Sequence, residues 1–366
     1  MAKYRFGDVV KEVKINVNRD NNPYEFYVAG DHLDSEDLII RRKGRFSTDD
    51  VGPAFTRIFH PGQVLYGSRR TYLKKVAIAD FDGICANTTF VLETKDNNIF
   101  TQELLPFIML SDRFTEWSVS HSKGSTNPYV LFSDLADFEI ELPDINSQRS
   151  LAKKLASAHN VKESYKTLLK CTDELVKSQF IEMFGSIDNN KHRYPVCRIS
   201  EVCDILNGYA FQSKKYVDTG IRVIRIANVQ KGYIEDTDPQ FYPSSLFDEY
   251  EKYMLFENDL LLSLTGNVGR VGLLPKEMLP AALNQRVACI RPTERINKTF
   301  LFKMMNLDSF EKDCIDNSSG SAQKNMSTEW LKRYKFILPP MYEQKKFVRI
   351  SEQADKSKQI AFSRAS

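Results

Sequence analysis

The chain has 366 residues, more than one hydrophobic core usually organises, so two domains of ordinary size are expected. Its hydrophobic share of 42% and charged share of 27% are typical of a soluble globular protein, and no apolar run is long enough for a membrane span. The net charge of +3 neither demands nor excludes a nucleic-acid partner, because local clusters of charge matter more than the sum.

The start of the chain and the cysteines indicate the compartment. Residues 1–6 contain no apolar signal core, so we expect a cytoplasmic protein. The six cysteines form no CxxC pair, and Cys197 and Cys203 are spaced too loosely for a common zinc knuckle. We therefore expect free thiols in a reducing compartment and no metal site.

The first part of the chain alternates short β-like runs with turn residues. Residues 76–79 are one such run, Asp82 and Gly83 form a turn, and residues 101–115 have a helical pattern. This combination predicts a mixed, strand-rich domain over residues 1–143.

A long helical spacer is predicted next, over residues 144–185. Residues 146–184 contain neither Pro nor Gly, and Gly185 suits the C-terminal end of a helix. Such a helix is roughly 60 Å long, so its apolar stripe needs a partner helix. The stripe is formed by apolar side chains at helical spacing: Leu151, Leu155, Ala158, Tyr165, Leu168, Leu175 and Val176. We expect partner contacts from all of these except Val176.

The rest of the chain repeats the first part, at an offset of 196 residues for most of its length. Residues 63–68 line up with residues 259–264, and residues 5–9 resemble residues 198–202. We therefore expect a second domain of the same kind over residues 186–340. Four pairs of landmarks are each 196 residues apart: Gly124 and Gly320, Leu135 and Leu331, Pro143 and Pro339, and Gln148 and Gln344.

A second helical arm is predicted over residues 341–366. Residues 341–350 are the counterpart of the first turns of the spacer, and they carry the apolar Phe347 and Ile350. The arm would pair with the spacer in antiparallel fashion if the two domains lie at opposite ends. The expected fold is α+β, with two similar strand-rich α/β domains separated by long coiled-coil helices in a pseudo-two-fold repeat.

Several segments occur in an order that is typical of one family. The first domain contains YVAGDHLD at residues 27–34 and GQVLYGSRRTYLKKVA at residues 62–77. The second contains GYAFQS at residues 208–213, SLTGNVG at residues 263–269 and NQRV at residues 284–287. With these segments the chain resembles the specificity subunits of type I restriction-modification systems over nearly its whole length.

The resemblance implies two target recognition domains, each of which reads one half of a split site in double-stranded DNA. It implies that the helical spacer sets the gap between the half-sites and docks methyltransferase subunits, and through them the ATP-dependent restriction subunit. The chain itself would hold no cofactor; its partners would use S-adenosylmethionine, ATP and Mg. No membrane is involved.

The length of the second arm departs from the family's pattern. A helix over residues 341–366 is roughly 39 Å long, which is shorter than the spacer. Either the chain is a naturally shortened form, or a second copy or another subunit covers the exposed spacer.

DNA binding needs cations that neutralise phosphates and groups that reach base edges. The two domains differ most at such polar positions while their apolar landmarks agree, which predicts an asymmetric target. In the first domain we expect contacts from Arg41, Arg42, Tyr66, Arg69, Arg70, Tyr72, Lys74, Lys75, Lys123, Ser125 and Asn127. In the second we expect them from Tyr209, Phe211, Ser213, Lys214, Thr265, Asn267, Arg270, Gln285, Arg286, Gln323, Lys324 and Asn325. Each of these side chains also has a plainer interpretation as a solvated surface group.

Motifs for catalysis are weak in this sequence. Residues 127–129 hold one of the two prolines of an amino-methylase motif, and residues 324–326 hold none. Residues 265–269 hold two glycines, which is a weak signal for a cofactor loop. We therefore expect no catalytic residue. The alternative function is a scaffold or assembly protein whose duplicated domains bind protein.

Overall fold

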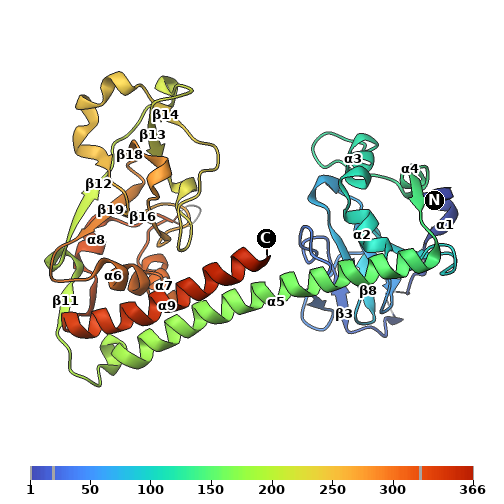
Figure 1. The fold of residues 1–366 in the computed structure, drawn as a ribbon, viewed down its shortest axis with the longest axis horizontal. Helices are drawn as coiled ribbons and strands as arrows, with labels where there is room; N and C mark the ends of the chain where they lie inside the picture. Colours follow the sequence, from blue (N-terminus) through green and yellow to red (C-terminus); the bar gives the residue numbers. More distant parts are fainter. Residues whose placement is uncertain (1, 19–20, 321–323, 366) are drawn as a thin grey trace. The chain divides into compact units, whose positions relative to one another are not determined.

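The computed structural model describes residues 2–18, 21–320 and 324–365, with side chains up to Gln359 (Figure 1). Two compact units divide the chain, Met1–Glu163 and Ser164–Ser366. The division falls inside helix α5 (Ile145–Phe184), so each unit contains one part of this helix. Within the described ranges, no helix is long and apolar enough to cross a membrane.

Unit 1 is built on small sheets, of which the described residues form three. The first pairs β1 (Ala2–Arg5) with β10 (Glu139–Leu142). The second has the order β2 (Val10–Glu12), β9 (Thr89–Thr94), β6 (Val64–Gly67) and β7 (Val76–Ile78). The third has the order β4 (Gly44–Arg45), β3 (Phe26–Val28), β8 (Gly83–Ala86) and β5 (Phe55–Phe59). Only the β3–β8 pair is parallel among these.

The helices of unit 1 cover the second sheet. They are α1 (Phe6–Val9), α2 (Leu105–Leu110), α3 (Asp112–Ser120), α4 (Phe132–Ala136) and the first part of α5. The predicted helix over residues 101–115 is two helices, because Ser111 is extended and its hydroxyl accepts a hydrogen bond from the Phe114 N–H. This side-chain cap starts a new helix at Asp112.

Unit 2 has the same sheets in the same strand order, which confirms the predicted repeat. Its two-stranded sheet pairs β11 (Val196–Arg198) with β20 (Lys335–Ile337). The next has the order β12 (Cys203–Asn207), β19 (Val287–Pro292), β16 (Leu260–Ser263) and β17 (Val271–Leu273). The last has the order β14 (Phe241–Tyr242), β13 (Ile221–Ile224), β18 (Ala281–Leu283) and β15 (Met254–Leu255), and the β13–β18 pair is again parallel.

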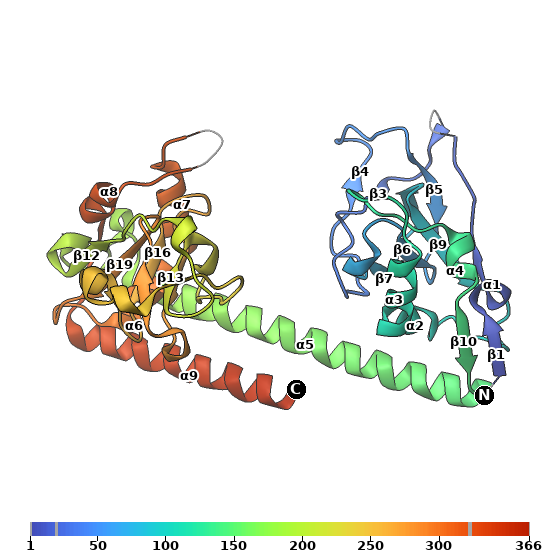
Figure 2. The same cartoon turned by 90° about the horizontal axis from the view of Figure 1, so that it is seen from above.

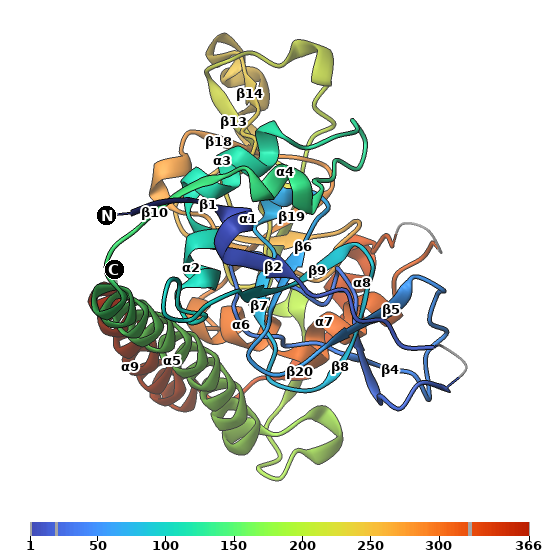
Figure 3. The same ribbon diagram turned by 90° about the vertical axis from the view of Figure 1, so that its right-hand side faces the viewer.

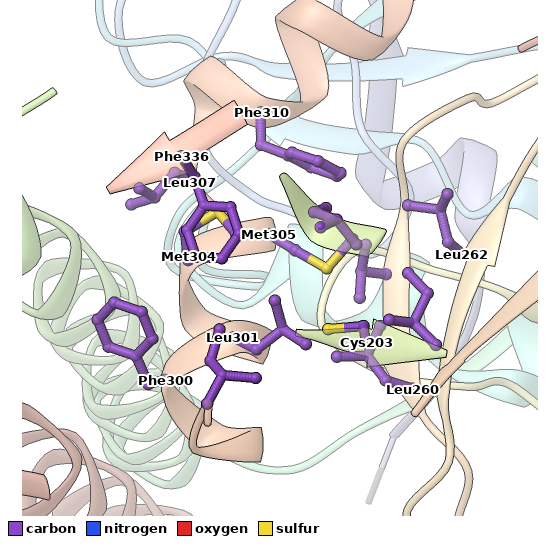
Figure 4. Packing of buried hydrophobic residues seen from close by; sticks show 14 of the residues in the cluster. Cys203, Leu260, Leu262, Phe300, Leu301, Met304, Met305, Leu307, Phe310 and Phe336 are labelled. Carbon is purple, nitrogen blue, oxygen red and sulfur yellow. The ribbon is translucent and has the colours of Figure 1, made fainter. Parts of the chain in front are cut away.

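Helices α6 (Lys298–Met305), α7 (Asp308–Asp316), α8 (Thr328–Arg333) and α9 (Met341–Ala365) belong to unit 2. The apolar face of α6 is buried against the sheet that contains β16. Figure 4 shows Leu301 and Met305 of α6 facing Cys203, Leu260 and Leu262, all of which are buried. This core holds the helices of unit 2 onto its sheet.

The second part of α5 pairs with α9 in antiparallel fashion, as predicted (Figures 2 and 3). Phe347 near the start of α9 contacts Phe180 and Phe184 near the end of α5. Further along α9, Lys358 pairs with Asp173, which lies earlier on α5. The two helices are thus held by an aromatic cluster at one end and an ion pair at the other.

Helix α5 ends where the sequence predicted, and only part of its predicted apolar stripe is buried. Gly185 ends the helix with a φ of 72°, and its N–H donates to the Ile181 carbonyl at 2.8 Å, as expected of a helix C-terminus. The face buried in unit 2 is formed by Val176, Phe180 and Phe184. Leu175 is 62% exposed, because one residue along a helix turns the side chain by about 100°.

Candidate DNA interface

Two loops of unit 1 are joined through their backbones. The segment after β6 forms a bridge from Arg69 to Tyr129, and Tyr129 also bridges to Lys123. The Arg70 N–H donates to the Pro128 carbonyl at 2.7 Å, and the Val130 N–H donates to the Ser68 carbonyl at 2.9 Å. These bonds fix a small platform at the end of β6, which we call platform 1 and define as residues 68–70 and 123–130.

Unit 2 has the same platform 196 residues later. The Gly266 N–H donates to the Lys324 carbonyl at 2.8 Å, and the Met326 N–H donates to the Leu264 carbonyl at 2.8 Å. The bridges of unit 2 join Thr265 and Ser319 to Asn325. Each position equals its unit 1 counterpart plus 196, as for Arg70 and Gly266. We call the described residues 264–266, 319–320 and 324–326 platform 2.

The two platforms carry different side chains on this shared backbone. Platform 1 exposes Arg69, Arg70 and Tyr129, and the Tyr129 side chain was not among the expected contacts. Platform 2 has Thr265 and Asn325 at two of these positions, and the Thr265 hydroxyl donates to the Asn325 amide oxygen at 3.1 Å. At these three positions platform 1 presents two guanidinium groups and a phenol, whereas platform 2 presents a hydroxyl, a glycine and a carboxamide, with the exposed Lys324 beside them.

One position in both platforms requires a left-handed backbone. Gly266 has a φ of 73°, which glycine adopts without strain. Its counterpart Arg70 has a φ of 51°, and Lys74 has a φ of 48°. A side chain in this region costs roughly 1–2 kcal/mol. Such outliers concentrate at functional sites, so Arg70 is a strong candidate for a contact.

Arg69 and Arg70 also differ from the other expected cations of unit 1. Both are exposed, and within the described ranges neither forms a side-chain ion pair. The other cations bind groups of their own unit: Arg41 binds Asp37 and Glu163, Arg42 binds Asp34, Lys74 binds Asp112 and Glu36, Lys75 binds the Gly30 carbonyl, and Lys123 binds Asp134. These cations serve first to hold loops together.

The remaining expected contacts of unit 1 divide into buried and exposed side chains. Tyr66 is 1% exposed and packs against Phe90 and Phe114, so it is a core residue and cannot contact DNA in this structure. Burial raises the pKa of its hydroxyl to about 12. Tyr72 is 55% exposed, and Ser125 and Asn127 are exposed within platform 1.

The expected aromatic contacts of unit 2 are half-buried. The Tyr209 ring contacts Phe211 and Tyr250, and Phe211 also contacts Tyr242. The neighbouring side chains of Ser213 and Lys214 are exposed. The aromatic pair therefore supports the loop that carries Ser213 and Lys214.

The other expected contacts of unit 2 have different environments. Asn267, Gln285, Arg286 and Lys324 are exposed. Arg270 is half-buried, and its guanidinium donates to the Gln230 side chain at 2.5 Å. Gln323 lies outside the described residues.

Asp82, Glu93 and Lys95 lie close together in the sequence, and a nuclease site would need such acids and a lysine to converge on one point. His60 contacts the Asp82 carboxylate, with 2.6 Å between Nδ1 and Oδ1. Glu93 pairs with Lys11 at 3.0 Å, and Lys95 donates to the Gly7 carbonyl. Because Asp82, Glu93 and Lys95 each bind a different partner, their geometry does not support a nuclease site.

The chain contains two copies of one α/β domain, and the two copies have matching platforms. It also contains a long helix that pairs with a second helix. These features define a protein with two recognition domains. The model of the family described as the type I restriction modification DNA specificity domain matches residues 3–170 and 192–363. The chain therefore belongs to this family.

Two curated relatives show how far the similarity extends. The type I restriction enzyme MjaVIII specificity subunit of Methanocaldococcus jannaschii is 26% identical over 280 residues, which cover 72% of this chain and 65% of the relative. The EcoAI specificity subunit of Escherichia coli is 31% identical over 157 residues, which cover 42% of this chain and 26% of the relative. The alignments thus span less than two thirds of the length of these relatives.

Two solved structures have a similar fold. A chain from a study of complex assembly and conformational transition in a type I R-M system has a TM-score of 0.55, with 21% identity, 100% of this chain covered and 93% of that chain covered. The S subunit of a type I restriction-modification system from M. genitalium has a TM-score of 0.56 and 13% identity, with 100% and 91% covered. The fold is therefore that of a type I specificity subunit.

Proposed function

We propose that this chain recognises DNA as the specificity subunit of a type I restriction-modification complex. Each unit reads one half of a split target, unit 1 through platform 1 and unit 2 through platform 2. The chain carries out no catalytic step itself. Family membership supports this role, and the platforms give it a physical basis.

One observation carries the proposal: the platforms share their backbone and differ in their side chains. Arg69 and Arg70 suit phosphates and the O6 and N7 acceptors of guanine in the major groove. Thr265, Asn325 and the exposed Gln285 suit adenine or bases that present both donors and acceptors. Different readers on one scaffold give a target whose halves differ in sequence.

The other exposed groups of each unit serve as supporting contacts. In unit 1 these are Tyr72, Ser125, Asn127 and the newly identified Tyr129; in unit 2 they are Ser213, Lys214, Asn267, Arg286 and Lys324. The paired cations Arg42, Lys74, Lys75 and Lys123 contribute a positive field rather than base contacts, because each side chain is already held by a partner within its own unit.

The helices are the surfaces through which the chain meets its protein partners. Leu151 and Leu168 of α5 are 41% and 51% exposed, and Leu175 is 62% exposed. Exposed leucines on one long helix favour contact with helices of a methyltransferase subunit. That subunit would use S-adenosylmethionine, and the restriction subunit of the complex would use ATP and Mg. Phe347 is buried inside unit 2, so it stabilises the subunit rather than a partner contact.

A DNA shift assay tests the proposal. The chain is combined with a type I methyltransferase subunit from the same source and titrated with a pool of random-sequence duplexes. The expected result is enrichment of duplexes that share one split motif. Binding of all duplexes with equal affinity, with and without the methyltransferase, would contradict the proposal.

A further inference from the structure

Three residues of metal-binding type come together in unit 1, where the recognition domain meets α5. His159 and Glu163 are four residues apart on α5 and therefore share one face of the helix. Asp37 lies just before Ile39, which bridges to Ile78 of β7. One ligand atom from each of the three residues lies within 4.8 Å of the other two. Asp37 is 6% exposed, so this is not a surface cluster of acids.

The imidazole of this cluster has an unusual environment. Nε2 of His159 is buried, and within the described ranges it has no hydrogen-bond partner. A buried polar nitrogen without a partner destabilises the folded protein. One nitrogen of this imidazole lies within 4.8 Å of a carboxylate oxygen of Asp37 and of Glu163, so a cation between the three residues would have all of them within reach.

The guanidinium of Arg41 already binds both carboxylates of the cluster. Nε of Arg41 donates to the Asp37 carboxylate at 2.6 Å, and the same guanidinium donates to Glu163. These bonds neutralise the two carboxylates but do not reach His159. Arg41 was expected to bind DNA, and in this structure its guanidinium instead joins the recognition domain to α5.

The second repeat has an ordinary ion pair at the same place. The counterpart of His159 is Asp355 (159 + 196 = 355), which accepts a hydrogen bond from Lys303 at 2.8 Å. Lys358 lies 3.5 Å from the same carboxylate. Both repeats therefore fasten a helix to a recognition domain at this point, and the imidazole is specific to the first repeat.

An ion has a path to the cluster. His159 lines a cavity of about 450 Å³, whose walls include Ile39, Phe107 and Asn160. Ile39 is 39% exposed, so the cavity reaches solvent. The cluster is thus buried enough to hold a metal ion and accessible enough to load it.

We propose that Asp37, His159 and Glu163 bind a divalent transition-metal ion of the zinc type, which clamps the first recognition domain to α5. One imidazole nitrogen and two carboxylate oxygens are a ligand set that such ions accept, with water as a fourth ligand. Mg²⁺ fits poorly, because it favours oxygen ligands in octahedral geometry. This proposal depends on the geometry of unit 1 and not on the proposed function.

Binding requires small movements within unit 1. Ligand atoms around a tetrahedral zinc ion with bonds of about 2.1 Å are about 3.4 Å apart, so the cluster must contract from its present spacing of up to 4.8 Å. Rotation of the Glu163 side chain would supply part of this contraction, and Asp37, whose Oδ1 also accepts a hydrogen bond from the Ile39 N–H at 3.0 Å, would have to shift as well. Arg41 must release the carboxylates, so the guanidinium and the metal ion compete for them.

Cobalt(II) absorption and zinc equilibrium dialysis on the full chain test the proposal. The natural sequence should bind one tightly held ion per chain, with a visible d–d band from Co²⁺. His159→Gln and Glu163→Gln should each weaken binding at least 10-fold. Arg41→Gln should strengthen binding, because it removes the competing cation. The matched control is His60→Gln, which removes an exposed imidazole that contacts Asp82 and should change nothing.

Several results would overturn the proposal. One is binding that His159→Gln leaves unchanged, and another is binding that His60→Gln removes. Weaker binding by Arg41→Gln would also contradict the competition between guanidinium and metal. Far-UV circular dichroism shows whether each variant is folded, and the two ligand variants are independent, so the failure of one to fold leaves the test intact.

Discussion

At the residue scale, Arg70 and Gly266 show how one backbone supports two chemistries. Both occupy the same position of the repeat with a positive φ, at 51° and 73°. Glycine adopts this conformation without strain, whereas the arginine keeps it at a cost. Among the described residues the Arg70 side chain forms no ion pair, so no ion pair within the unit offsets this cost. We propose that a contact outside the unit, with DNA, accounts for its presence.

Replacing Arg69 and Arg70 by Ala tests this contact. We expect DNA affinity to fall about 10-fold or more, and the slope of log Kobs against log salt to become less steep by about 0.9 for each phosphate that the variant no longer neutralises. Specificity should change in one half-site only. Fluorescence anisotropy at several salt concentrations measures both effects, and Lys11→Ala, which removes an exposed cation paired with Glu93, is the control. Relaxed specificity in both half-sites would contradict the division between the units.

At the element scale, the pairing of α5 with α9 depends on a few aromatic side chains. Phe347 is 0% exposed and contacts Phe180, Phe184 and Phe300. The sequence predicted both helices from the lack of Pro and Gly and from the repeat. It could not predict which side chains of α5 are buried, because Leu175 and Val176 are adjacent apolar residues and only tertiary packing decides between them.

Phe347→Ala should destabilise unit 2 by about 3–5 kcal/mol, because it removes a buried ring and leaves a cavity. Tyr342→Ala on the same helix is the matched control, since Tyr342 is 68% exposed and should change stability by less than about 0.5 kcal/mol. Urea unfolding followed by circular dichroism measures the difference. Equal effects of the two substitutions would show that α9 does not depend on this aromatic cluster.

The attachment of α5 to α7 should depend on pH. Hydrogen bonds from Lys177 and Lys231 lower the pKa of Asp308 from its usual 3.8 to about 2. The lowered pKa means that the ionised carboxylate stabilises the fold above pH 3.8, and that this contribution disappears as the pH falls through 2.

Asp308→Asn should therefore lower stability at pH 6 and matter much less at pH 2.5. The effect at pH 6 should be about 0.5–1 kcal/mol, since the Asp308 side chain is exposed. Urea midpoints at the two pH values measure it, with Asp316→Asn on the same helix as control. An effect of Asp308→Asn that is equal at both pH values would exclude the pairing as its cause.

At the scale of the whole molecule, duplication was the feature that the sequence predicted best. The offset of 196 came from landmarks such as Gly124 and Gly320, and the two strand orders match throughout. The site was predicted less well. Arg69 and Arg70 are exposed as expected, but Tyr66 is buried and Arg41 is held by Asp37, because burial and pairing depend on residues distant in sequence. Tyr129 could have been found, since its counterpart Asn325 was already a candidate.

The length of α5 should set the gap between the half-sites. Deleting seven residues of α5 close to the boundary of the two units, about two helical turns, shortens the helix by about 10.5 Å and keeps the phase of its faces nearly unchanged. That length corresponds to about three base pairs of B-DNA, so the gap should shrink by about this number. Both half-site sequences should stay the same. Selection from random duplexes measures the gap, and an unchanged gap would count against α5 as a ruler.

The division of a split target between the two units has one most direct test. It is a genome-wide map of modified bases in cells that co-express the chain with a type I methyltransferase subunit from the same source. We expect one asymmetric motif of two half-sites with a fixed gap, and the Arg69→Ala, Arg70→Ala variant should alter one half only. Modification without a split motif, or a change in both halves, would contradict the division.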